Sequence, residues 1–160
     1  MAKKQLSDWA AIAEIIGAVA IVFSLLYVGF EIQRNTKVGL ASNRQEIAAR
    51  AQELALYSAE TGIYRLLFDE STDRAELTPV EQDRLTAYIG ALLRTTEEAF
   101  LLNRDGLLDD EYWMTRAGVM MAALRTDEAR QIYVRTRALG FYTSDFTDWA
   151  DQALKSKYGE

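Results

Sequence analysis

"EIIGAVAIVFSLLYVGFEIQRNT", residues 14–36, is the stretch on which the interpretation of the whole chain depends. From Ile15 to Phe30 it contains 16 consecutive residues without a charge. At about 1.5 Å per residue, a helix of this length covers roughly 24 Å, short of the roughly 30 Å of bilayer hydrocarbon. The helical pattern extends further, however, from Trp9 to Ile32, and a helix of that length can span a bilayer.

The two ends of this stretch also fit a bilayer. Glu14 and Glu31 lie about one turn inside the ends of the helical pattern, where a carboxylate can reach the membrane interface. Trp9 and Tyr27 lie near the two boundaries, where membrane proteins concentrate aromatic side chains. Between the two glutamates the helix has no polar face that could meet water. We therefore expect a single transmembrane helix.

Two alternatives share part of this pattern. The central helix of a soluble bundle is also apolar on all sides, but the rest of the chain would then have to surround it completely. A cleaved signal peptide would explain Lys3 and Lys4 as its basic segment. Against that reading, Glu14 precedes the apolar stretch and no small-x-small cleavage site follows it.

Small residues recur along one face of the predicted span at alternating steps of three and four, namely Ala10, Ala13, Gly17, Ala20 and Ser24. Positions with this spacing share one side of a helix. Membrane helices associate where small side chains let two backbones approach closely, so this face is a candidate helix–helix contact. The same face continues to Tyr27 and Glu31, which are candidate polar groups at an interface or in a pore.

The composition excludes much familiar chemistry. The chain has no cysteine and no histidine, so it lacks disulfides, thiolate or imidazole metal sites, and histidine-based catalytic triads. Residues 1–36 carry no net charge, which leaves the net charge of −6 on residues 37–160. An acidic domain repels phosphate backbones. We therefore expect no enzyme activity, no cofactor, no metal site and no nucleic-acid partner.

The remaining sequence predicts an all-α fold. The first helix can run on into a second from about Val38 to Phe68, and a polar loop is predicted at 69–79. Thr78, Pro79 and Glu81 form a capping-box pattern for a helix that stops at Gly106. Further helix starts are predicted at Asp109 or Asp110, at Thr126 and at Ser144. The expected organisation is a transmembrane helix in 1–36 and a small bundle of about four further helices within an acidic domain, 37–160.

Two polar positions inside the predicted helices raise the question of a buried site. For the adjacent acids Glu97 and Glu98, we expect an ion pair with Arg94 one turn away, because a catalytic or cation site needs further converging acids. For Arg116, close to Trp113 in the sequence, we expect ring stacking or a partly buried ion pair. No ligand needs to be invoked for either.

Three segments together carry a resemblance: "IGAVAIVFSLLYVGFEIQRNT" at 16–36, "LLRTTEEAFLLNRDGLLDDEYW" at 92–113 and "FYTSDFTDW" at 141–149. They resemble a widespread group of uncharacterised bacterial proteins that begin with an apolar helix ending in a Glu/Gln-Ile-Gln/Arg-x-Asn-Thr motif. The resemblance covers most of the chain. It implies a bacterial, membrane-anchored helical protein, and it transfers no activity and no functional residue.

The functional expectation is a membrane-anchored, non-enzymatic protein that self-associates or docks on a membrane partner. The bacterial inner membrane is the expected location. More basic residues follow the span than precede it, which favours a cytoplasmic domain. One alternative is an oligomeric pore lined by the N-terminal helices. The other is a ligand-sensing domain with an aromatic pocket, for which the candidates are Tyr88, Phe100, Tyr112, Trp113 and Tyr133.

Overall fold

The computed structural model describes residues 2–69 and 77–159, without the side chains of residues 2–8 and 10–12. The described residues form helices and no strand, in the order α1 (Ala2–Thr61), α2 (Ile63–Phe68), α3 (Pro79–Arg104), α4 (Asp110–Ala123), α5 (Asp127–Ala138) and α6 (Ser144–Tyr158). The predicted all-α fold is confirmed. Most of the predicted loop at 69–79 lies outside the described residues.

The chain divides into two compact units, Met1–Ala41 and Ser42–Glu160. Asn35 and Thr36 do not interrupt α1, so the first predicted helix does run on into the second. The second predicted helix ends earlier than Phe68, however. Gly62 adopts a left-handed conformation with φ 74°, and the chain turns there into the short helix α2. That break is a correction to the predicted helix over 38–68.

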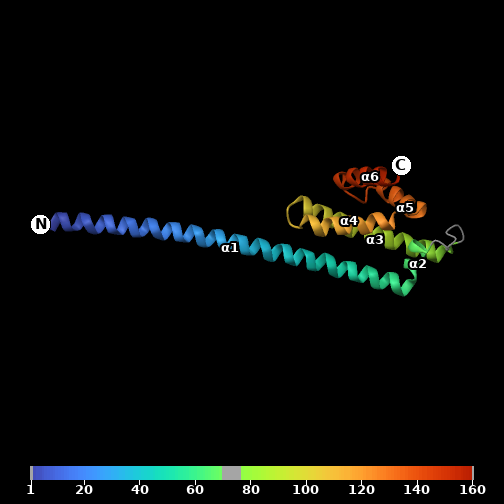
Figure 1. Ribbon diagram of the computed structural model, residues 1–160, viewed down its shortest axis with the longest axis horizontal. Helices are drawn as coiled ribbons and strands as arrows, with labels where there is room; N and C mark the ends of the chain where they lie inside the picture. Colours follow the sequence, from blue (N-terminus) through green and yellow to red (C-terminus); the bar gives the residue numbers. More distant parts are fainter. Residues whose placement is uncertain (1, 70–76, 160) are drawn as a thin grey trace. The chain divides into compact units, whose positions relative to one another are not determined.

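Helix α3 is the central element of the second unit and packs against α2, α4, α5 and α6 (Figure 1). It begins with the predicted capping box. The Thr78 hydroxyl accepts the Glu81 amide at 3.3 Å, and the Glu81 carboxylate accepts the Thr78 amide at 2.9 Å. Leu85, Ile89 and Leu93 then recur at helical spacing on the apolar face of α3. All three are fully or almost fully buried in the core.

The structure confirms the predicted caps of α4 and α5 but not that of α6. Asp109 caps α4 by accepting the Tyr112 amide at 3.0 Å, and Thr126 caps α5 by accepting the Ala129 amide at 3.3 Å. The prediction for α6 is wrong by one residue. Thr143 is the cap position, without a side-chain bond, and Ser144 is already the first helical residue.

The core of the second unit consists of two clusters. The larger joins α2, α3, α4, α5 and α6 around side chains with no exposed surface, among them Ile89, Met120 and Phe146. The smaller joins Ile47 of α1 to Trp113 and Ala117 of α4. Burial of apolar side chains in these clusters stabilises the unit by roughly 1.5–3 kcal/mol for each large side chain.

Candidate functional site

The first unit contains an apolar surface that no other described residue of that unit covers. The large apolar side chains between Ile15 and Phe30 expose 48–71% of their surface. The helix from Ala13 onward is long and apolar enough to cross a membrane, and its most apolar window is not buried in the structure.

Most of the predicted small-residue contact face lies on described parts of α1. Ala13, Gly17, Ala20 and Ser24 are all exposed, and a Cβ added at Gly17 would meet no atom within 4 Å. The Ser24 hydroxyl donates to the Ala20 carbonyl at 2.8 Å, so the hydroxyl is satisfied within its own helix. The side chain of Ala10 is outside the described residues. The predicted contact itself stays a prediction.

Tyr27 and Glu31, the candidate polar groups, follow on the same helix. Tyr27 exposes 69% of its surface, and Glu31 is partly exposed. Gln33, Arg34 and further polar residues come directly after them in the sequence. The apolar stretch therefore ends in a short polar segment.

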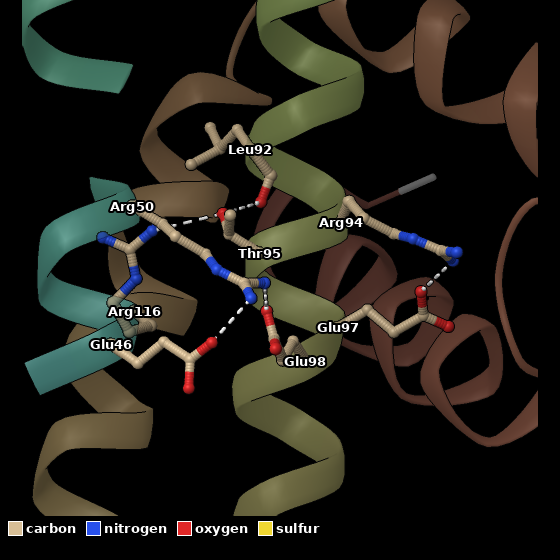
Figure 2. A network of polar contacts seen from close by, with 8 residues as sticks. All are labelled: Glu46, Arg50, Leu92, Arg94, Thr95, Glu97, Glu98 and Arg116. Carbon is tan, nitrogen blue, oxygen red and sulfur yellow. Dashed lines mark hydrogen bonds and ion pairs between the residues drawn. The ribbon is translucent and has the colours of Figure 1, made fainter. Parts of the chain in front are cut away.

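Helix α1 contributes a second, polar surface where its residues after Ser42 pack on α3 and α4 (Figure 2). Arg50 pairs with Glu46 on its own helix at 2.8 Å and with Glu98 on α3. Arg44 pairs with Asp109 at the start of α4, and this bond holds the pKa of Asp109 below its ordinary value of 3.8. Ile47 lies between Arg44 and Arg50 on α1, is 1% exposed, and packs in the smaller core cluster with Trp113 of α4.

Arg116 lies in α4 with only 8% of its surface exposed. It contacts the Thr95 hydroxyl at 3.5 Å, and its Nε has no hydrogen-bond partner among the described residues. The expected ion pair and ring stacking of Arg116 are not seen in the described part of the chain. Its charge contributes to the environment of Tyr88, whose pKa is raised by burial and partly lowered again by Ser58 and Arg116.

The pair of adjacent acids on α3 separates into two different environments. Glu97 is buried, 3% exposed, and pairs with Arg94 at 3.0 Å, which confirms the predicted ion pair. Its other oxygen accepts the Thr143 amide at 2.6 Å. Glu98 pairs with Arg50 instead. The two adjacent acids thus belong to separate ion pairs.

A cavity of about 590 Å³, open to solvent on one side, lies beside Arg94, between α3 and the connection from α5 to α6. Its α3 wall is made of small residues one turn apart, and its other wall includes Phe141 and Tyr142. Sequence reasoning missed this cavity. The available signal was the recurrence of small residues over Thr86–Ala91 directly before Arg94, but the opposite wall is supplied by residues about 50 positions later in the chain.

The aromatic residues proposed for a sensing pocket are mostly part of the core. Phe100 and Trp113 lie 5.5 Å apart between ring centroids, and both contact the ring of Trp149. The Tyr133 hydroxyl donates to Asp151 at 2.8 Å, and burial together with that carboxylate raises its pKa. Tyr112 lies 6.0 Å from the guanidinium of Arg44.

The described residues contain no group of three or more acidic side chains placed to hold a metal ion. Comparisons with protein families, with curated proteins and with solved structures find no match to this chain. Three features of the described residues remain as candidates for a function: the apolar surface of α1, the polar contacts of α1 with α3 and α4, and the cavity beside Arg94.

Proposed function

We propose that this protein is a membrane-anchored helical protein without enzyme activity, which self-associates or docks on a membrane partner. The observation that carries the proposal is the exposure of every large apolar side chain from Ile15 to Phe30 within the first unit. Leaving that much apolar surface in water costs about 25 cal/mol for each Å². Bilayer hydrocarbon is the environment that removes the cost along the whole stretch.

The proposed location is the bacterial inner membrane, with the acidic second unit in the cytoplasm. Arg34, Lys37, Arg44 and Arg50 follow the span within 20 residues of Phe30, whereas Lys3 and Lys4 precede it. Basic residues near a span favour the cytoplasmic side. The proposed partners are the lipid bilayer and a second copy of the chain or another membrane protein, and no nucleic acid.

The orientation can be tested with one introduced cysteine, because the natural chain has none. Ser156 is an exposed residue near the end of α6, so Ser156→Cys provides a labelling site on the second unit. A membrane-impermeant maleimide should leave it unlabelled in intact spheroplasts and label it after permeabilisation. Labelling in intact spheroplasts would place the second unit outside the cytoplasm.

Self-association through the small-residue face can be tested by adding bulk to it. Gly17→Leu puts a large side chain on the proposed contact, and Val22→Leu adds one methylene on the opposite face as the control. In lipid nanodiscs, crosslinking of the native chain and of Val22→Leu should give the same oligomer, and Gly17→Leu should shift it toward monomer. A strict monomer with no co-purifying membrane protein, unchanged by Gly17→Leu, would contradict the proposal.

A further inference from the structure

The walls of the cavity beside Arg94 present few free hydrogen-bonding groups. Its α3 wall includes Ala87, Gly90 and Ala91. The hydroxyl of Thr86 donates to the Gln82 carbonyl at 2.8 Å, and that of Thr136 donates to the Ile132 carbonyl at 2.9 Å. Both hydroxyl protons are therefore used inside their own helices. A volume of about 590 Å³ with such walls suits the apolar body of a small molecule.

The tyrosine in the opposite wall stays neutral. Burial is the main cause that raises the pKa of Tyr142, and the charge of Glu97 raises it further, whereas a bond with Thr136 and the charge of Arg94 oppose the shift. Its ring extends the apolar surface that Phe141 contributes. Of the residues that line the cavity, Arg94 is the ionised one.

Arg94 is held in place by one nitrogen. Its Nη1 donates to the buried carboxylate of Glu97 at 3.0 Å and to the Phe141 carbonyl at 2.8 Å. No bond from its Nε or Nη2 to a described residue is seen, and 70% of the side-chain surface is exposed. In Figure 2, Arg94 extends away from the Arg50 network and is linked to Glu97. The guanidinium is thus fixed while its Nε–Nη2 edge stays available.

That edge has the geometry that a carboxylate prefers. Two parallel N–H groups of a guanidinium bind the two oxygens of a carboxylate in a fork, and such charge-assisted pairs are strong and directional. Glu97 uses its second oxygen to accept the Thr143 amide at 2.6 Å. The negative charge of this buried carboxylate is therefore not stabilised by Arg94 alone. A phosphate monoester can bind the same fork, but it carries a charge of about −1.5 to −2, more than the single charge of Arg94 balances.

We propose that this cavity binds an apolar monocarboxylate, with its carboxylate on Arg94 and its hydrocarbon body against Ala87, Gly90 and Ala91. A medium-chain fatty acid anion or an arylalkanoate has this chemistry. The site belongs to the second unit alone and does not depend on the proposed membrane anchor.

The test uses the full chain in nanodiscs of zwitterionic lipid with radiolabelled octanoate as the probe, and empty nanodiscs measure partition into lipid. The native protein should bind octanoate saturably above that background, and unlabelled 4-phenylbutyrate should compete whereas octanol should not. Arg94→Gln should weaken binding by about tenfold to a hundredfold, because the charge-assisted pair is lost. Arg84→Gln, an exposed arginine of α3 outside the cavity, is the matched control.

A second variant keeps the test decisive if Arg94→Gln does not fold. A Cβ at Gly90 would meet no atom within 4 Å, so Gly90→Leu should fill the cavity with the Arg94–Glu97 pair intact. Gly90→Leu should abolish saturable binding. Binding no greater than that of empty nanodiscs, or binding by either variant equal to that of the native chain, would overturn the proposal.

Discussion

At the scale of single residues, Gly62 makes the turn between α1 and α2. A glycine inside a helical pattern is a weak break signal, because helices tolerate it at a modest cost. The structure uses it at φ 74°, where the chain turns so that Ile63 and Leu67 reach the core with 0% and 1% exposure. The turn depends on packing against α3, which local sequence does not encode.

Gly62→Ala should lower the free energy of unfolding by about 1–2 kcal/mol, because a side chain is strained in the left-handed region. Gly90→Ala is the matched control, since Gly90 is a helical residue with open space at its Cβ. That change should stabilise by about 0.5–1 kcal/mol. Denaturant titration of the two variants measures both values. Equal effects of the two changes would show that the turn at Gly62 is not required.

Asp109 gives the second unit a predictable response to acid. Its pKa is lowered by the bond from Arg44 and then by the Tyr112 amide, so its folded-state value lies below the unfolded value. The stabilisation is therefore complete above the unfolded pKa and is lost as the pH falls through the folded value, that is, below about pH 4. Asp109→Asn should flatten the decrease in melting temperature between about pH 5 and about pH 3. An unchanged acid profile in this variant would contradict the assigned pairing.

At the scale of elements, the helix starts were the most predictable features. Thr78, Asp109 and Thr126 all act as caps because a short polar side chain before an apolar helical pattern satisfies free amides. The start of α6 could not be assigned correctly, because Thr143 and Ser144 are adjacent and both carry a hydroxyl. The small-residue face of α1 also follows from spacing alone. The cavity does not, because its walls come from distant helices.

The capping box at α3 can be tested by a matched pair of threonine variants. Thr78→Ala should destabilise the second unit by about 1 kcal/mol, because the hydroxyl that accepts the Glu81 amide is removed. Thr86→Ala lies inside the same helix, where its hydroxyl bonds the Gln82 carbonyl, and should be neutral or slightly stabilising. Denaturation midpoints of the two proteins measure the difference. Similar midpoints would contradict a role for the cap.

At the scale of the whole molecule, the two units differ in what they do with their apolar side chains. The second unit has a core of aromatic and aliphatic side chains, in which the Phe146 ring lies 5.8 Å from Phe100 and 5.9 Å from Trp149. In the first unit, the large apolar side chains that the structure describes from Ile15 to Val38 are exposed. The sequence predicted the apolar helix from length and charge. It could not predict which aromatic residues would meet in the core, because those contacts join α3, α4 and α6.

Phe146→Ala should therefore destabilise the second unit by about 3–5 kcal/mol, through lost burial and a residual cavity. Leu139→Ala is the control, because Leu139 exposes 68% of its surface, and it should change stability by less than about 0.5 kcal/mol. The melting temperature of each variant can be measured from the loss of its near-ultraviolet circular dichroism on heating. Comparable melting temperatures for the two would contradict the assigned core.

The central claim is that residues 15–30 lie in hydrocarbon, and extraction of cell envelopes with alkaline carbonate tests it most directly. We predict that the full chain stays in the membrane pellet and is released only by detergent, whereas a variant with Val19 and Val22 both changed to Asp moves to the supernatant. Release of the native chain by carbonate, followed by a monodisperse protein in buffer without amphiphile, would contradict the claim.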